Sequence, residues 1–139
     1  MVVVDGQGIP LGGQIASASP GEVALVESTL ATIRVPRKGG GRPKSKPERL
    51  IGDKAYDSDP LRHKLKRRGI DMIAPNRRGR KRKTQDGRKL RRYRRRWLVE
   101  RTIACLQTFR RLAVRYERHV RLYRAFFHLA CLIITLRHL

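Results

Sequence analysis

Two segments of this chain, the first basic loop (residues 36–47) and the second basic loop (residues 76–92), consist largely of arginine, lysine and glycine, with almost no apolar side chains. Such segments cannot bury enough apolar surface to offset the entropy that is lost when a chain is ordered into a core. We therefore expect both to be exposed loops. The remaining sequence is long enough for one domain with a single modest core, which would span residues 1–139.

The charge of the chain predicts a polyanionic partner. Arginine and lysine total 34 against 11 aspartate and glutamate residues, which gives a formal net charge of +23, far more than solubility requires. DNA is the favoured partner, because phosphates spaced along a backbone reward clustered cations through counterion release.

Other features argue against a membrane, secreted or zinc protein. The apolar run Ala125–Leu136 contains His128 and Thr135 and is shorter than the roughly 18 to 20 residues that a span needs, so we expect a buried helix and no membrane partner. The N-terminus lacks a signal peptide, which favours the cytoplasm. Cys105 and Cys131 stand alone and are expected to be small buried residues.

The first third of the sequence predicts a hairpin and a helix. The apolar runs Val2–Val4 and Ile9–Ile15 flank an Asp-Gly pair, which is typical of hairpin turns. Ser19 then has the position of an N-cap, with Pro20 at the first helical position. The apolar residues of this helix fall on one face, formed by Val23, Val26, Leu30 and Ile33.

The middle of the sequence predicts a strand, a helix and another strand. Arg49–Asp53 is a short apolar run that ends on an acid. Asp57 or Ser58 can cap the next helix, which stops at Gly69. Residues 70–75 then alternate as a second strand.

The C-terminal third predicts two helices. The first runs from about Leu90 to Val114, and Glu100 is expected to be partly buried beside its apolar stripe. That stripe is formed by Val99, Ile103, Leu106 and Ala113. The second helix, Leu122–Leu136, is apolar on every side. This order of elements suits a mixed sheet covered by helices, which is an α/β or α+β fold.

Two acids suggest phosphodiester chemistry, in which two divalent ions held by carboxylates stabilise the attacking and leaving oxygens. Asp53 follows a strand, where α/β folds place functional groups, although an acid there can also open a loop or cap a helix. Glu100 follows a run of arginines, and its alternative role is an intrahelical pair with Arg96 or Arg101.

Longer motifs around these acids resemble a known family. Residues 51–58, Ile-Gly-Asp-Lys-Ala-Tyr-Asp-Ser, resemble the Ala-Asp-Lys-Ala-Tyr-Asp-Ser segment of bacterial insertion-sequence transposases of the DDE type. Tyr93, Arg96 and Glu100 reproduce the family's Tyr-x2-Arg-x3-Glu signature. The Phe-Arg-Arg-Leu and Arg-Tyr-Glu segments that follow are also similar, so the resemblance covers the chain from the hairpin onward.

The resemblance implies a truncated ribonuclease H-like fold, a mixed sheet with flanking helices that lacks its first strand. It also implies a two-metal magnesium (Mg2+) site, hydrolysis at transposon ends and strand transfer. Asp53 and Glu100 would be two of three catalytic carboxylates and metal ligands. Tyr93 and Arg96 would contact DNA or orient Glu100, with helix packing as the alternative for Tyr93; Lys54 is either a phosphate contact or a solvated side chain.

Two departures from the family pattern bear on activity. Gln107 stands where the family has a lysine, and Arg110 or Arg111 are candidates to supply that DNA contact. The family's first Asp lies on a strand before the hairpin, which this chain does not include, and Asp5 is better explained by the tight turn. We therefore expect the chain alone to be inactive and to need a third carboxylate from outside it. The expected protein partner is a second copy of the chain or an upstream transposase segment.

Further DNA contacts are expected from Arg77, Arg78, Arg80, Lys81, Arg82, Arg110 and Arg111. The partners would be transposon-end and target DNA, in a bacterial cytoplasm and associated with the nucleoid. The alternative function is a non-catalytic DNA-binding remnant or a regulator of an intact transposase. An RNA-binding or ribosome-associated protein is disfavoured, because the phenylalanines fall on predicted helices and not on a strand surface where bases stack.

Overall fold

The structure of the protein is a computed structural model that describes residues 1–17, 21–85 and 87–138. Along the chain the elements are β1 (Val2–Val4), β2 (Pro10–Gly13), α1 (Glu22–Ala31), β3 (Arg49–Ile51), the 3₁₀ turn η1 (Lys54–Tyr56), α2 (Asp59–Arg67), β4 (Asp71–Ile73), α3 (Gly87–Leu90), the 3₁₀ helix η2 (Arg91–Arg96), α4 (Trp97–Gln107), α5 (Arg110–Ala113) and α6 (Val120–Leu136). The prediction of a fold that mixes helices and strands is confirmed at the level of α+β.

The predicted hairpin is confirmed. Strands β1 and β2 pair antiparallel, with a register shift after Val3. In the turn, the Oδ1 atom of Asp5 accepts hydrogen bonds from the backbone N–H groups of Gln7 at 2.8 Å and Ile9 at 2.9 Å. Gly8 has a φ of 91°, a conformation that favours glycine. Asp5 is therefore the turn residue that the sequence indicates.

The expected single mixed sheet is not formed by the described residues. Strands β3 and β4 pair parallel over three residues each, from Arg49 opposite Asp71 to Ile51 opposite Ile73. This pair and the hairpin are two separate two-stranded sheets. The physical reason is that no described strand lies between β1 and β3 to bond to both edges.

Helices α1 and α2 form the main core with β4. The buried residues of this core are Val26, Leu30, Ile33, Leu61, Leu65, Ile70, Met72 and Ala74. Helix α2 has Ser58 as its N-cap and ends before Gly69, which has a φ of 72°, so both predicted boundaries are confirmed. Gly21 occupies the N-cap position of α1. The predicted cap Ser19 and Pro20 lie outside the described residues.

The prediction of one continuous helix from Leu90 to Val114 is wrong. The chain is 3₁₀ over Arg91–Arg96, and α4 ends at Gln107. There the hydroxyl of Thr108 donates to the carbonyl of Cys105 at 2.7 Å, while Phe109 becomes extended and packs into a second core. The second basic loop is also shorter than expected, because residues 87–92 are helical.

The buried face of α4 is displaced from the predicted stripe. Its buried residues are Leu98, Thr102 and Leu106, whereas Ile103 and Ala113 are exposed and Val99 is half-buried. The displacement follows from contact with the hairpin turn, where the hydroxyl of Thr102 donates to the carbonyl of Gly8 at 2.6 Å.

Helix α6 buries only one side, formed by Phe127, Ala130 and Ile134, so the expectation of a helix buried all round is wrong. Phe127 packs against Gly13, where an added Cβ atom would lie 2.5 Å from the ring. The opposite side exposes leucines, because no described element covers it: Leu122, Leu129, Leu132 and Leu136. Among the described residues, no helix is long and apolar enough to span a membrane.

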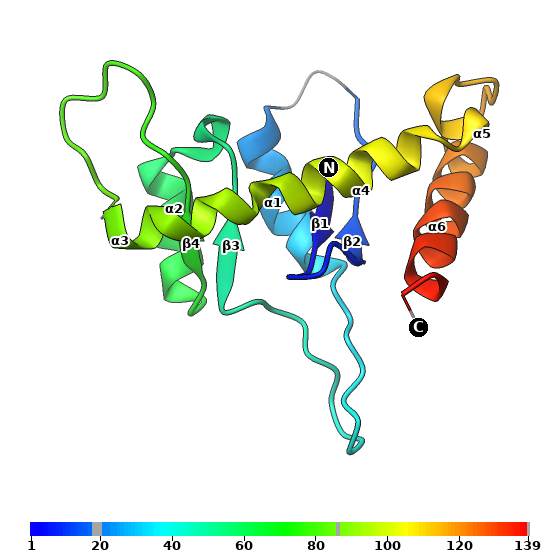
Figure 1. Cartoon of the computed structure of the whole chain (residues 1–139), viewed down its shortest axis with the longest axis horizontal. Coiled ribbons are helices and arrows are strands. Elements are labelled where there is room, and N and C mark those ends of the chain that lie inside the picture. Colours follow the sequence, from blue (N-terminus) through cyan, green and yellow to red (C-terminus); the bar gives the residue numbers. More distant parts are fainter. Residues whose placement is uncertain (18–20, 86, 139) are drawn as a thin grey trace.

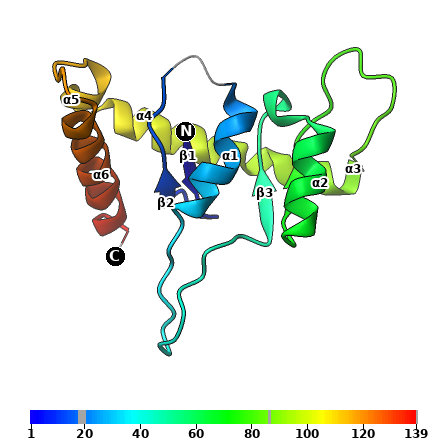
Figure 2. The same cartoon turned by 180° about the vertical axis from the view of Figure 1, so that it is seen from behind.

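Helices α1 and α2 lie on one side of the strands, and η2 with α4 crosses the other side (Figures 1 and 2). The first basic loop projects from the end where β3 begins (Figure 1). The second basic loop projects from the opposite end, where β3 and β4 finish (Figure 1). The two basic loops therefore extend from opposite ends of the strands.

Candidate active site

Asp53 lies just beyond the C-terminal end of β3, in the position that the sequence predicts. It caps the turn η1, and its Oδ1 atom accepts a hydrogen bond from the backbone N–H of Lys54. Gly52 precedes it, and a Cβ atom there would lie 2.7 Å from the Met72 methyl group. Glycine thus leaves room for the side chains of Met72 and Tyr56 where the chain turns toward Asp53.

Glu100 meets Asp53 through the guanidinium group of Arg96. Nη1 of Arg96 donates to Oδ2 of Asp53 at 2.8 Å, and Nη2 donates to Oε1 of Glu100. The intrahelical pair that the sequence left open is therefore formed, and the same arginine also binds an acid that lies 43 residues earlier.

Both carboxylates are accessible from solvent. The side chain of Asp53 is 40% exposed, that of Glu100 54% and that of Arg96 31%. The prediction that Glu100 is partly buried is wrong, because the buried face of α4 turns toward the hairpin and leaves Glu100 outside. An ion or a phosphate can therefore reach both acids.

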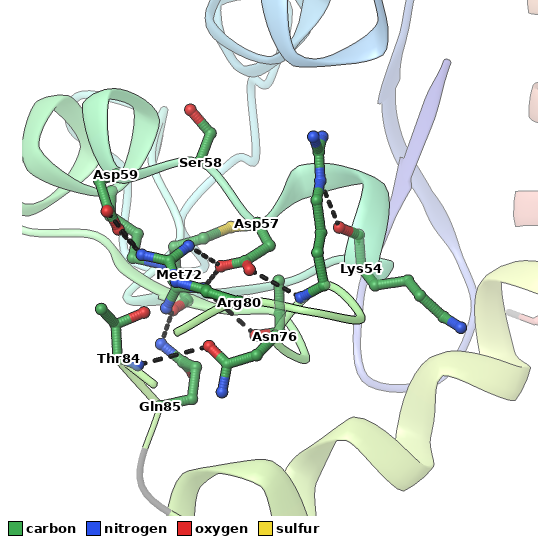
Figure 3. A network of polar contacts seen from close by, with 12 residues as sticks. Lys54, Asp57, Ser58, Asp59, Met72, Asn76, Arg80, Thr84 and Gln85 are labelled. Atoms are coloured by element: carbon green, nitrogen blue, oxygen red, sulfur yellow. Dashed lines mark hydrogen bonds and ion pairs between the residues drawn. The ribbon is translucent and has the colours of Figure 1, made fainter. Parts of the chain in front are cut away.

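Tyr93 and Lys54 border this pair of acids. The Arg96 guanidinium lies 5.7 Å from the centroid of the Tyr93 ring, a cation–π contact that keeps this ring beside the arginine that binds both acids. The side chain of Lys54 is exposed and extends away from the polar network around Asp57 (Figure 3). The structure thus places the residues of the Tyr-x2-Arg-x3-Glu motif and Asp53 at one surface.

The chemistry of these groups fits a hard divalent cation. Magnesium prefers carboxylate oxygens, and Asp53 and Glu100 offer such oxygens on the two sides of one guanidinium group. Within the part of the chain that the structure describes, no group of three His, Cys, Asp or Glu residues could hold a metal ion. The described residues thus fit as two ligands of such an ion.

Asp57 is a buried carboxylate near Asp53. The sequence indicated it only as a possible helix cap. The side chain of Asp57 is fully shielded from solvent. It accepts hydrogen bonds from Nη2 of Arg62 at 2.7 Å, from Nη1 of Arg80 at 2.8 Å and from the backbone N–H of Arg77 at 2.8 Å. Burial raises the pKa of Asp57, but these hydrogen bonds outweigh it and hold the pKa below the ordinary carboxylate value.

The predicted DNA contacts of the second basic loop fall into two groups. Arg77 and Arg80 are bound to protein groups: Arg80 also pairs with Asp59, and the Arg77 guanidinium donates to two backbone carbonyls. The other three, Arg78, Lys81 and Arg82, have exposed side chains.

Arg110 and Arg111 are not brought to Asp53. They lie on α5, beyond the end of α4 and away from β3 (Figures 1 and 2). Nη1 of Arg111 donates to Glu117 at 2.7 Å, and this hydrogen bond lowers the pKa of Glu117. Gln107 is exposed at the end of α4.

Comparisons with known proteins identify relatives over almost the whole chain. A family model described as transposase DDE domain matches residues 1–136. A Burkholderia cepacia protein, provisionally named as the transposase for insertion sequence element IS402, is 35% identical over 133 residues. This alignment covers 96% of the chain and 60% of the length of the relative. No solved structure matches.

Proposed function

The chain belongs to the DDE transposases of insertion sequences, and we propose that Asp53 and Glu100 are two of the three carboxylates of its catalytic centre. The observation that carries this proposal is their convergence. Two acids from different elements bind the same Arg96 guanidinium at an exposed surface of a strongly basic chain.

Each residue of this surface has a chemical role in the proposal. Asp53 and Glu100 would hold magnesium ions, which supply Lewis-acid stabilisation to the attacking and leaving oxygens of a phosphodiester. Arg96 binds both carboxylates and offsets their mutual repulsion. Tyr93 restrains the Arg96 side chain through its ring, and Lys54, which follows Asp53, would contact a DNA phosphate.

A third carboxylate would come from outside this chain, on a strand that completes a ribonuclease H-like sheet. In the described part of the chain β1 pairs with β2 alone and β3 with β4 alone, so each small sheet has an open edge. Helix α1 contacts both the hairpin and η1, so the same helix packs against both small sheets. A strand added alongside β3 in parallel would end beside Asp53. Asp5 is engaged in its turn and does not fill this role.

The substrate of this centre would be DNA, both transposon ends and target. The exposed cations Arg78, Lys81 and Arg82 lie on the loop that follows β4, at the same end of the strands as Asp53 (Figure 1). They would therefore draw a phosphate backbone toward the proposed centre. The reaction would be hydrolysis at the ends of the element followed by strand transfer.

The alternative is a DNA-binding protein without catalysis, such as a regulator of intact transposase. The observation that favours it is that the described residues include no group of three carboxylates that could hold a metal ion, and that Asp53 and Glu100 are both already bound to Arg96. Non-specific binding would then depend strongly on salt and not on magnesium.

A nicking assay on supercoiled DNA tests the catalytic proposal. This chain is compared with a version extended upstream by the region that carries the family's first Asp, with and without magnesium. We expect nicking by the extended protein alone, and its loss in the extended Asp53→Asn and Glu100→Gln variants, because each removes a metal-holding oxygen. DNA binding should remain in both variants.

Two outcomes contradict the proposal. Nicking that survives in both variants means that neither acid belongs to the centre. Nicking by the short chain that Asp53→Asn abolishes shows that a third acid is already present, and the proposal that this acid lies outside the chain is then wrong.

A further inference from the structure

We propose that Asp57 is a positioning residue that fastens the arm, residues 76–85 of the second basic loop, to the turn that carries Asp53. The exposed cations of the arm would then meet DNA at a fixed place relative to the candidate metal-binding carboxylate. This inference rests on the proposed function for its meaning, but its tests measure binding and local opening, not cleavage.

The first connection is the Asp57 carboxylate itself. Its three donors come from two places: Arg77 and Arg80 belong to the arm, and Arg62 belongs to α2. Figure 3 shows Arg80 beside Asp57. Arg62 also donates to the carbonyl of Ala74 at 3.3 Å, just after β4. A fully shielded carboxylate therefore joins the arm, a helix and the end of a strand.

The second connection runs from the arm to the turn η1. The Arg77 guanidinium donates from Nε to the carbonyl of Lys54 at 3.3 Å and from Nη2 to the carbonyl of Ala55 at 2.7 Å. These carbonyls follow directly after Asp53 in the chain. If the Arg77 backbone moves away from Asp57, the Arg77 guanidinium, which is bound to η1, is therefore displaced as well.

The base of the arm is closed by further contacts. The backbone N–H of Thr84 donates to the side-chain oxygen of Asn76 at 3.4 Å, and the amide of Gln85 donates to the carbonyl of Met72 at 3.4 Å (Figure 3). Arg80 adds a bond from Nε to the carbonyl of Arg82 at 2.8 Å. The arm is thus anchored through its base and interior, while its remaining cations face solvent.

This arrangement predicts an effect opposite in sign to simple electrostatics. Replacing Asp57 with asparagine removes one negative charge from a chain of formal net charge +23, which by charge alone strengthens DNA binding. If Asp57 holds the arm in place, the same change releases the arm. Each DNA-binding event must then order the arm again, at a cost in conformational entropy. DNA binding should weaken.

The test compares Asp57→Asn with Glu27→Gln, which removes the same charge from an exposed carboxylate paired with Lys64 and Arg68 on the surface. Binding of a short fluorescein-labelled DNA duplex is measured by anisotropy across a salt series. We expect affinity about threefold to tenfold lower for Asp57→Asn, from the cost of reordering arm side chains, and equal or slightly higher for Glu27→Gln. Tighter binding by Asp57→Asn overturns the proposal.

A second pair of variants keeps the charge constant and decides the matter if Asp57→Asn is unfolded by circular dichroism. Lysine in Arg80→Lys has one ammonium group and cannot span Asp57 and Asp59 as the guanidinium does. Arg67→Lys, on the exposed side of α2, is the matched control.

Hydrogen exchange at the backbone amides of residues 54–57 is the readout that links the arm to Asp53. We expect faster exchange there in Arg80→Lys than in wild type or Arg67→Lys, because the loosened arm no longer holds Arg77 against the turn. Unchanged exchange, with unchanged DNA affinity, would show that the arm and the turn are independent. A failure of nicking in the earlier assay leaves this comparison intact.

Discussion

The two basic loops look alike in composition but are held to the protein in different ways. The first basic loop is closed at its base by two backbone hydrogen bonds between Val35 and Lys44, at 2.9 and 2.8 Å. At its tip, residues 39–41 are glycines with open space around them, so that a Cβ atom added there would meet nothing within 4 Å beyond the adjacent residues. The arm is instead anchored by the shielded Asp57 carboxylate and by Asp59.

The difference teaches that charge composition does not determine the mechanics of a basic loop. The acids that hold the arm lie about 20 residues earlier, directly after η1 and at the start of α2, and the parallel pairing of β3 and β4 brings the two segments to the same end of the strands. The first basic loop, which like the arm contains no acid of its own, projects from the end of the strands away from Asp53 (Figure 1). We expect the arm to serve as a fixed contact and the first basic loop to adapt to its partner.

The largest expected effect is a difference between the two loops in how much a substitution lowers the free energy of unfolding. Asp57→Ala should lower the free energy of unfolding by about 3 kcal/mol. The reason is that the guanidinium groups of Arg62 and Arg80 lose their negatively charged partner in a site that is shielded from solvent. Lys44→Ala in the first basic loop should change it by about 0.5 kcal/mol at most. Urea denaturation followed by circular dichroism measures both, and equal losses would remove the distinction.

A smaller effect is expected in limited proteolysis with trypsin. Cleavage after Lys38 in the first basic loop should be about ten times faster than cleavage after Lys81 in the arm, because local opening of an anchored segment costs free energy. The initial rates are followed by mass spectrometry. In Asp57→Asn the two cleavage rates should become similar. Equal cleavage rates for the arm and the first basic loop in the wild-type protein would contradict the comparison.

The smallest effect concerns acid pH. The pKa of Asp57 is lower in the folded protein than its ordinary value, so its stabilising contribution is present above the ordinary value and is lost as pH falls through the lowered one. The difference in unfolding free energy between wild type and Asp57→Asn should stay constant from pH 7 to about pH 5 and shrink below about pH 4. Urea titrations at several pH values measure it; a difference that grows in acid would contradict this assignment.

Local signals in the sequence predicted the hairpin and the first two helices well. An Asp-Gly pair, a serine cap and a terminal glycine act within a few residues of the structure they specify. The break after α4 carried no such signal, because it is made by a threonine hydroxyl and by the burial of Phe109 in the second core. Leu106 was predicted correctly as buried, but Leu98 and Thr102 are buried in place of Val99 and Ile103, because the hairpin, far away in sequence, contacts that face of α4.

The candidate site was predictable as residues but not as an arrangement. The motifs indicated Asp53, Arg96 and Glu100, yet the exposure of Glu100 and the double role of Arg96 depend on how α4 crosses the strands. Asp57 was missed as more than a helix cap, because its partners in the arm are brought to it only by the tertiary fold. Charge pairing over such separations has no periodic signature in sequence.

The contact between the hairpin turn and α4 also affects how this protein is made. Thr102, whose hydroxyl donates to the carbonyl of Gly8, is synthesised 94 residues after it. At ordinary translation rates this interval is roughly 5 to 20 s. During that time the hairpin has neither α4 nor α6 to cover it, and its unpaired strand edges are available to other nascent chains. The pace of the ribosome therefore sets how long this protein is exposed to misassembly.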